Sequence, residues 1–259
     1  MNDAKQDQKV HWAANTYDES MSFVSSFGED VLSWLNPQAG EIIVDFGCGT
    51  GDLASAISSQ GSEVIGVDIS PEMVERARLK YPHLTFHRAD GMGWKADRAY
   101  DAVFSNAALH WMKDADAAVD SMTAGLRNGG RLVVEFGGYG NVATIIEAVR
   151  ETLQANGRED AFVMPWYFPQ VGEYASLLEK YGMEVRFAQL FDRPTVLNNG
   201  ENGMKDWLEM FGTAMFPKTE QYEMGLWIEE STRRLKDKLY DQGVWTADYR
   251  RLRVLAVKR

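Results

Sequence analysis

The fold of this chain is decided by the stretch Val44-Asp45-Phe46-Gly47-Cys48-Gly49-Thr50-Gly51-Asp52. It ends a short apolar run, residues 41–46, and precedes a helical stretch that begins at Asp52. A short apolar run that ends in glycines is typical of a buried strand. Glycines at alternate positions let the backbone turn tightly and let a ligand approach it closely. The stretch therefore predicts a strand, a ligand-binding turn and a helix.

Outward from this turn, short β-rich runs alternate with helical stretches. Ser70 followed by Pro71, for example, is a strong signal for the start of a helix. The predicted strands are residues 41–46, 62–68, 84–89, 100–106, 131–137, 183–194 and 245–258. The predicted helices are residues 52–60, 71–80, 114–126, 141–154 and 171–181, with one or two more between 10 and 35. This alternation predicts an α/β fold with a doubly wound, mostly parallel sheet. The last two of the seven predicted strands are expected to form a hairpin, so that the last strand is antiparallel.

Composition excludes several classes of protein. One cysteine, Cys48, among 259 residues rules out an internal disulfide framework and a cysteine-based zinc site. The net charge of −11 argues against a protein whose main role is to grip nucleic acid or an anionic membrane. The sequence contains neither an apolar run of about 20 residues nor the apolar segment of a secretory signal. We expect a cytoplasmic protein that binds neither membrane, nucleic acid nor metal.

The spacing of the glycines discriminates between cofactors. A dinucleotide fingerprint is G-x-G-x-x-G, whereas the spacing from Gly47 is G-x-G-x-G, with Asp52 at the start of the helix. A pyrophosphate prefers uncompensated N–H dipoles at that position. Acids at 45 and 52 suit a positively charged ligand, such as a sulfonium that also carries an ammonium group. The pattern points away from NAD and FAD and toward S-adenosylmethionine.

Polar residues end the next predicted strands as well. Asp68 ends the second strand, where a carboxylate can accept both hydroxyls of a ribose, and Ile69 can lie on an adenine face. Asp90 ends the third, where it can receive the adenine amino group, and Asn106 ends the fourth. Open α/β sheets bind ligands at this carboxyl edge. We therefore expect the cofactor there.

Five stretches together resemble the class I S-adenosylmethionine-dependent methyltransferases, whose fold is Rossmann-like. They are VDFGCGTGDL (44–53), VIGVDIS (64–70), HRADGM (87–92), FSNAALHWM (104–112) and GLRNGGRLVVEFG (125–137). Three features also resemble the trans-aconitate methyltransferase-like, or methyltransferase type 11, group. They are NAALHWM (106–112), the aromatic residues between 160 and 169, and a last predicted hairpin that is interrupted by residues 198–243. The resemblance implies that WAANTYDES (12–20) closes over the cofactor.

The resemblance and the strand-end reasoning together give a set of expected cofactor contacts. The three glycines flank the methionine part, Asp68 holds the ribose, and Asn106 lies near the methionine. The full set is Trp12, Tyr17, Asp45, Gly47, Gly49, Gly51, Asp68, Ile69, Asp90, Gly91, Met92 and Asn106. The cofactor is S-adenosyl-L-methionine and the product S-adenosyl-L-homocysteine.

Residues 198–243 are helical in composition and interrupt the last predicted hairpin, although hairpins normally close in about two to five residues. We predict an N-terminal helical cap (1–36), a methyltransferase core (37–197 and 244–259) and a helical lid insert (198–243). The lid would roof the acceptor pocket together with residues 166–168. Helically spaced Met and aromatic residues in the insert suit either a core or an apolar pocket.

The expected reaction is methyl transfer to a carboxylate or hydroxyl oxygen of a small molecule, by a monomer or homodimer. His110 is the candidate catalytic base for a hydroxyl, and it can equally be a pocket-lining or capping residue. Trp111 is expected to line the substrate pocket, and Trp166, Tyr167 and Phe168 either line it or pack beneath the lid. One alternative is a protein that binds S-adenosylmethionine without transferring its methyl group. A nucleic-acid methyltransferase is a further alternative, although Ser105-Asn106-Ala107-Ala108 differs from the Asn/Asp-Pro-Pro-aromatic motif of nucleobase enzymes.

Overall fold

The computed structural model describes residues 30–259, and these form two compact units. The larger unit contains residues 30–141, Trp166–Asp192 and Arg250–Arg259. The smaller unit contains Val142–Pro165 and Arg193–Tyr249. Most of the expected N-terminal cap lies outside the described residues, although residues 30–35 are helical.

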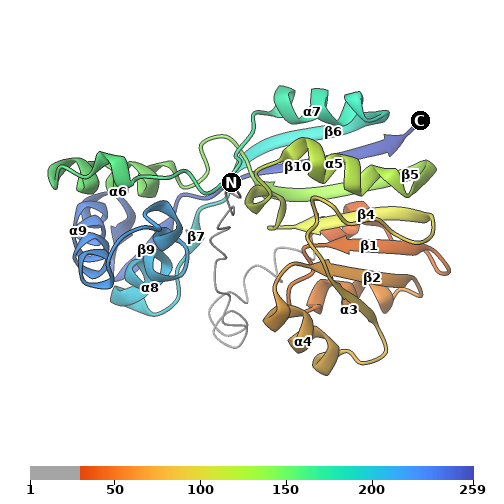
Figure 1. Cartoon of the computed structure of the whole chain (residues 1–259), viewed down its shortest axis with the longest axis horizontal. Coiled ribbons are helices and arrows are strands. Elements are labelled where there is room, and N and C mark those ends of the chain that lie inside the picture. Colours follow the sequence, from red (N-terminus) through yellow and green to blue (C-terminus); the bar gives the residue numbers. More distant parts are fainter. Residues whose placement is uncertain (1–29) are drawn as a thin grey trace, which may run out of the picture. The chain divides into compact units, whose positions relative to one another are not determined.

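The larger unit is built on a seven-stranded sheet with the strand order β3-β2-β1-β4-β5-β10-β6 (Figure 1). Its strands are β1 (Ile42–Phe46), β2 (Glu63–Asp68), β3 (Thr85–Arg88), β4 (Tyr100–Asn106), β5 (Leu126–Gly137), β6 (Met183–Asp192) and β10 (Arg250–Lys258). Neighbouring strands from β3 to β5 are parallel, and β10 is antiparallel to both β5 and β6. The predicted sheet, mostly parallel with an antiparallel last strand, is confirmed.

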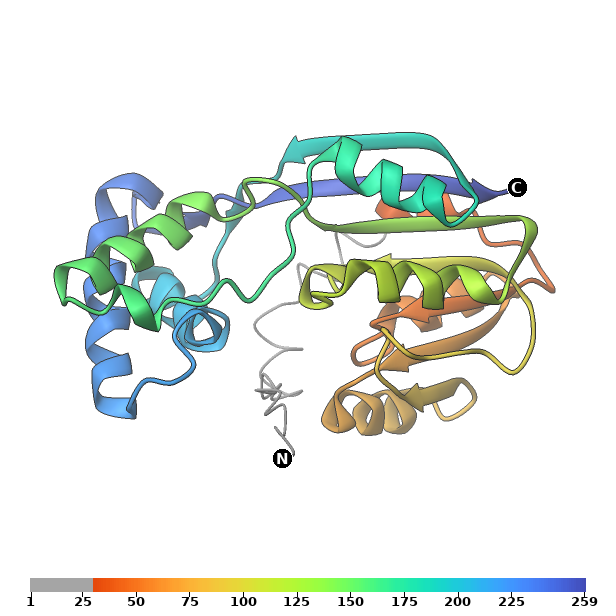
Figure 2. The ribbon, with the colours of Figure 1, turned by 45° about the horizontal axis from the view of Figure 1, so that its top comes forward.

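Helices cover both faces of this sheet because its strands are apolar on both sides. The helices are α3 (Asp52–Ser58), α4 (Pro71–Lys80), α5 (Ala115–Ala124) and α7 (Val171–Lys180), with a single 3-10 turn, η1 (Leu109–Trp111). Helices α5 and α7 lie side by side on one face (Figure 2) and share a core with Phe46 and Phe136. Helices α3 and α4 bury the other face, together with Val31 and Phe104. Burial of apolar side chains contributes about 25 cal/mol per Å² and dominates the stability of such a sheet.

Capping residues set the starts of two helices where the sequence predicts them. The Ser70 hydroxyl accepts a hydrogen bond from the Met73 N–H at 3.3 Å, ahead of Pro71. The Asp114 carboxylate accepts from the Ala117 N–H at 3.0 Å at the start of α5. Each cap satisfies a backbone donor that the first turn leaves unpaired.

Two predicted strand boundaries are wrong. Strand β5 begins at Leu126 rather than at 131, because the ladder with β4 starts before the predicted turn and continues beyond a register shift. The single strand predicted over 245–258 is two strands, β9 (Val244–Ala247) and β10. The break falls at Asp248, whose carboxylate accepts from the Thr144 N–H at 2.8 Å and whose carbonyl accepts from the Val142 N–H at 3.1 Å. Asp248 thus caps a helix instead of extending a strand.

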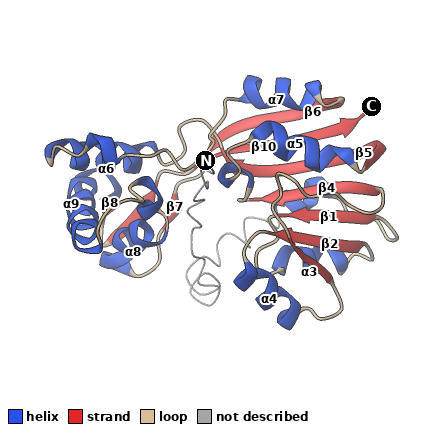
Figure 3. Cartoon of the chain, in the orientation of Figure 1, coloured by secondary structure: helices blue, strands red, loops and turns tan. Residues whose placement is uncertain are grey.

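The smaller unit is mainly helical, with a short three-stranded sheet in the order β7-β9-β8 (Figure 3). Its remaining elements are α6 (Ala143–Ala155), η2 (Glu159–Ala161), β7 (Thr195–Val196), η3 (Gly200–Asn202), α8 (Gly203–Met210), η4 (Gly212–Met215), α9 (Gln221–Leu239) and β8 (Tyr240–Asp241). Helix α6 packs against α9, and the Ser231 hydroxyl lies 3.0 Å from the Thr152 hydroxyl between them. The expected insert, 198–243, therefore shares its unit with α6.

Candidate active site

The glycine turn after β1 is held by close contacts that only glycine permits. Gly47 has a φ of 78°, and a Cβ at this position would lie 2.1 Å from the Cβ of Ala108. The turn after β1 therefore lies directly against the loop after β4. At Gly49, by contrast, a Cβ would meet nothing within 4 Å, so this face of the turn is open.

Asp45 is a buried carboxylate beside this turn. It is 2% exposed, and its Oδ2 atom has no hydrogen-bond partner among residues 30–259. Burial, and secondarily the negative charge of Asp68, raises the pKa of Asp45 to about 7. A carboxylate held in this way favours a cation beside it, because a cation offsets both the desolvation and the repulsion.

Asp68 ties the end of β2 to the glycine turn. Its Oδ2 accepts from the Gly49 N–H at 2.9 Å, and its Oδ1 accepts from the Ser70 N–H at 2.9 Å. Burial raises the pKa of Asp68, and the backbone hydrogen bonds oppose that rise. Backbone N–H groups of Ser70, Gly49 and Ile69 bond this carboxylate, and because an ionised carboxylate has about four lone-pair sites, it retains acceptor capacity for a ligand. Ile69, which is 51% exposed, follows directly.

The ends of β3 and β4 supply the other predicted cofactor residues. Asp90 is exposed, and its Oδ1 accepts from the Met92 N–H at 2.9 Å. Gly91 is enclosed, because a Cβ there would lie 2.8 Å from the ring of Phe46 and from the methyl group of Met112. Asn106 ends β4 and is half-buried.

One sequence expectation, a positively charged ligand beside Asp52, turns out differently. The Asp52 carboxylate needs no cationic ligand, because it pairs with Lys80 at 2.6 Å and accepts a hydrogen bond from the Tyr81 hydroxyl at 2.5 Å. Its charge is already compensated within the protein. The predicted contacts Trp12 and Tyr17 lie outside the described residues.

His110 lies in η1 and is 8% exposed. Its Nδ1 atom accepts a hydrogen bond from the Gly137 N–H at 3.4 Å. Burial, and secondarily the positive charge of Arg251, lowers the pKa of His110 well below its usual value. The imidazole is therefore neutral at pH 7 and is a weak base, since a low pKa means a small driving force for accepting a proton.

Aromatic rings gather around His110. The rings of Trp111 and Phe168 lie 5.6 and 5.9 Å from its imidazole, centroid to centroid. Trp166 is 6% exposed, stacks on Phe168 at 5.6 Å and meets Trp111 edge-on at 5.5 Å. These rings form a packed wall of the larger unit rather than a set of isolated contacts.

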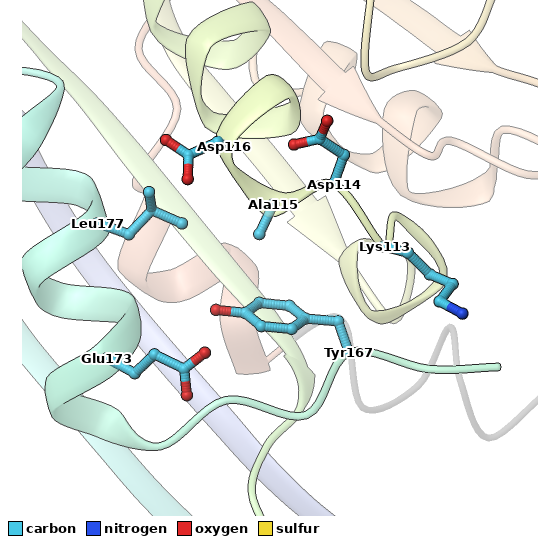
Figure 4. A pocket seen from close by; sticks show the side chains of 7 residues that line it. All are labelled: Lys113, Asp114, Ala115, Asp116, Tyr167, Glu173 and Leu177. Atoms are coloured by element: carbon cyan, nitrogen blue, oxygen red, sulfur yellow. The ribbon is translucent and has the colours of Figure 1, made fainter. Parts of the chain in front are cut away.

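Tyr167 lines a separate pocket of about 570 Å³, into which its ring points (Figure 4). The pocket is lined by Lys113, Asp114, Ala115, Asp116, Tyr167, Glu173 and Leu177. Its carboxylates already have donors: Asp114 caps α5, Asp116 pairs with Lys180, and Glu173 accepts from the Gln170 N–H at 3.3 Å. The acidity of this pocket therefore comes from helix caps and an ion pair.

Sequence reasoning missed Arg251. This arginine is 8% exposed, on a strand whose other buried residues are mostly apolar. The available signal was the alternation of arginine at 251 and 253 within RRLRVLAV, which places both side chains on one face of a strand. A charged residue on the inward face of a predicted strand calls for an explanation.

A seven-stranded sheet of this order, with a glycine turn and carboxylates at its carboxyl edge, defines a class I methyltransferase. Residues 43–130 match the family model described as a methyltransferase domain. The chain is 30% identical over 258 residues to the uncharacterized methyltransferase C70.08c of Schizosaccharomyces pombe, covering 96% of this chain and 98% of that protein. It is also 30% identical over 243 residues to the trans-aconitate 2-methyltransferase of Mycobacterium ulcerans, covering 88% of each.

A structural comparison supports the same fold. The magnesium protoporphyrin IX methyltransferase of Synechocystis PCC 6803, solved with bound S-adenosylhomocysteine, superposes with a TM-score of 0.54 and 17% identity, covering 91% of this chain and 83% of that one. The chain therefore belongs to the S-adenosylmethionine-dependent methyltransferases, the family that includes the trans-aconitate methyltransferases. As a member of this family, the chain uses S-adenosylmethionine as its cofactor.

Proposed function

We propose that this chain transfers the methyl group of S-adenosylmethionine to a carboxylate oxygen of a small organic acid. The observation that carries this choice of acceptor is the state of His110: it is buried, its pKa is lowered, and its Nδ1 accepts from a backbone N–H. A hydroxyl acceptor must lose its proton to a base during the transfer, whereas a carboxylate acceptor is already deprotonated. A site whose histidine is a weak base therefore suits a carboxylate acceptor.

The transfer requires mainly that the acceptor oxygen is aligned with the methyl group and that water is excluded from the site. A lone pair of the acceptor oxygen forms the bond to the methyl carbon while the electrons of the S–C bond return to sulfur. The sulfonium becomes a neutral thioether, the carboxylate becomes an ester, and no proton moves. Alignment and exclusion of water supply most of the acceleration in such a displacement.

The residues at the sheet edge fit the cofactor. The unpartnered oxygen of Asp45 suits the positive part of the ligand, and the open face of Gly49 gives it room. The remaining acceptor capacity of Asp68 suits the two ribose hydroxyls, and Ile69 supplies an apolar contact. We assign the adenine to Asp90, Gly91 and Met92, and the methionine moiety to Gly47, Gly51 and Asn106. Trp12 and Tyr17 remain predicted contacts.

Support for a small organic acid also comes from the relatives. One protein named trans-aconitate 2-methyltransferase, from Mycobacterium ulcerans, matches 88% of this chain. Within residues 30–259, no helix is long and apolar enough to cross a bilayer. We keep a cytoplasmic location, a monomeric or homodimeric state and the absence of a nucleic-acid partner as parts of this proposal.

The test is to incubate the purified chain with S-adenosylmethionine and a panel of small carboxylic acids, phenols and amines, and to measure S-adenosylhomocysteine. We expect turnover with acids. Turnover confined to phenols or amines contradicts the choice of acceptor, and tight binding of the cofactor without any turnover favours a protein that binds it without transferring methyl.

A further inference from the structure

Polar side chains converge on one residue, Gly137, at the carboxyl end of β5. Its N–H points at the Nδ1 of His110, and Arg251 is its partner across the β5–β10 pair. A Cβ at Gly137 would lie 2.8 Å from the Nδ2 of Asn141 and 2.5 Å from the ring of Phe168. An imidazole, an amide and an aromatic ring thus lie around a position that has no side chain of its own, and Arg251 is paired with it on the neighbouring strand.

Arg251 reaches this place because β10 runs antiparallel to β5. The first residues of β10 therefore lie at the edge where the parallel strands end, which is the edge that binds the cofactor. The neighbouring arginines of the strand also have partners within the protein. Arg250 pairs with Asp192 at 3.1 Å, and Arg253 pairs with Glu135 at 2.7 Å.

Burial makes the charge of Arg251 consequential. The residue is 8% exposed, so its guanidinium is largely removed from water at the ligand edge of the sheet. Electrostatic interactions of such a group are stronger than those of an exposed arginine, because water screens them less. Its positive charge also lowers the pKa of His110, which places the two groups in one electrostatic environment.

We propose that Arg251 is the specificity-determining residue for the acceptor, and that its guanidinium holds one carboxylate of the acid while another carboxylate receives the methyl group. The inference rests on the proposed function. The planar fork of arginine matches a carboxylate in two parallel hydrogen bonds, which fixes orientation as well as position. Asn141 and His110 flank the same position. An acid with a single carboxylate cannot both bind Arg251 and present a carboxylate to the methyl group.

The experiment compares two acids that differ in the number of carboxylates. Trans-aconitate carries three and crotonate carries one. With the full-length wild-type chain we expect kcat/KM for trans-aconitate to exceed that for crotonate by at least about tenfold. In Arg251→Gln we expect a loss of roughly 30-fold or more for trans-aconitate, mainly in KM, and a change of less than about threefold for crotonate. Arg251→Lys keeps the positive charge but not the planar guanidinium. Its kcat/KM for trans-aconitate should lie between those of wild type and Arg251→Gln.

The controls separate recognition from folding. Arg250→Gln removes the adjacent, partly exposed arginine and should leave both acids unaffected. Calorimetric affinity for S-adenosylmethionine should be unchanged in each variant, which also verifies that the cofactor site is folded. If Arg251→Gln fails to bind the cofactor, the comparison is made on Arg251→Lys alone, where trans-aconitate must still lose more than crotonate.

Equal losses for both acids, or no loss for either, would contradict the role of Arg251. A wild-type protein that methylates catechol but neither acid would overturn the inference and the proposed acceptor, while leaving methyl transfer to a small molecule intact. A wild-type protein that does not bind S-adenosylmethionine would contradict the proposed function itself. Failure of the inference is thereby distinguished from failure of the function.

Discussion

The carboxylate of Asp68, at the end of β2, accepts a hydrogen bond from the backbone N–H of Gly49 at 2.9 Å. The same carboxylate accepts from the Ser70 N–H at the approach to α4. One side chain therefore positions both the glycine turn and the loop that follows its own strand. In the proposed site, recognition of the ribose would depend on the same carboxylate.

We expect Asp68→Ala to weaken binding of S-adenosylmethionine by about 1–3 kcal/mol, the scale of lost hydrogen bonds to a charged group. Both the ribose contact and the order of the turn are lost in this variant. Isothermal titration calorimetry measures the change, and Asp114→Ala, which removes a helix cap elsewhere, is the control. Unchanged affinity in a folded Asp68→Ala protein would refute the assignment.

Asp45 should make stability depend on pH. Its pKa rises from 3.8 to about 7 on folding, so the folded state binds more protons than the unfolded state between these values. The stability of the unliganded protein should therefore fall as pH rises from about 4 to about 7 and then level off. Asp45→Asn should be more stable than wild type above pH 7, by on the order of 1–4 kcal/mol, and the difference should vanish toward pH 4.

Binding of S-adenosylmethionine should depend on pH in the opposite direction to the stability of the unliganded protein. Wild-type affinity for S-adenosylmethionine should increase as pH rises through about 7, because the ionised Asp45 carboxylate attracts the cation. The affinity of Asp45→Asn should be lower and should lack this step. Thermal denaturation with and without cofactor at several pH values measures both effects, and parallel curves for the two proteins would count against a charged Asp45 in the site.

His110 tests which oxygen is methylated. With a carboxylate acceptor, His110→Gln should reduce turnover by less than about tenfold, and kcat should be flat above the pKa of the acid. With a hydroxyl acceptor that needs a base, the loss should be roughly 10²-fold or more. Steady-state kinetics across pH 6–9 separates the two cases, and a large loss together with a pH-dependent kcat would overturn the choice of a carboxylate.

The N-terminal segment supplies a further prediction. If residues 12–20 close over the cofactor, removal of residues 1–20 should leave a folded sheet with poor affinity for S-adenosylmethionine. Circular dichroism checks the fold and calorimetry the affinity. A truncated protein that binds as tightly as wild type would exclude Trp12 and Tyr17 from the site.

Much of the sheet was predictable because its signals are local. Ser70-Pro71 and Asp114 begin helices by satisfying backbone donors next to them in sequence, and the apolar run at 42–46 is a strand in its own right. The break at Asp248 was not predictable, because the apolar pattern continues across it and the competing hydrogen bonds come from the distant Val142 and Thr144.

The candidate site shows the same limit. Glycines and acids at strand ends predict which edge of the sheet binds the cofactor, since their spacing along the chain is itself the signal. The partners of a charge are set by tertiary contacts: Lys80 neutralises Asp52, and the antiparallel β10 brings Arg251 opposite Gly137. Tyr167 lines a separate pocket while its neighbours Trp166 and Phe168 stack on each other, and this difference likewise depends on packing.

A test of the predicted insert must take account of α6, which packs against the insert's helix α9. Replacing residues 198–243 by a short turn removes α9, against which α6 packs. Apolar α6 residues such as Ile145 and Val149 should therefore be changed to polar ones in the same protein. We expect binding of S-adenosylmethionine to persist and transfer to the native acceptor to be lost. Full transfer by the shortened protein would show that the insert has no part in acceptor choice.

The central claim is methyl transfer to a carboxylate oxygen, and isotope tracing tests it most directly. The wild-type chain is incubated with S-adenosylmethionine carrying a trideuterated methyl group and with trans-aconitate, and the products are identified by mass spectrometry. The account predicts a trideuterated methyl ester and S-adenosylhomocysteine in equal amounts. Label on carbon, or bound cofactor that yields neither product with any carboxylic acid tested, would contradict it.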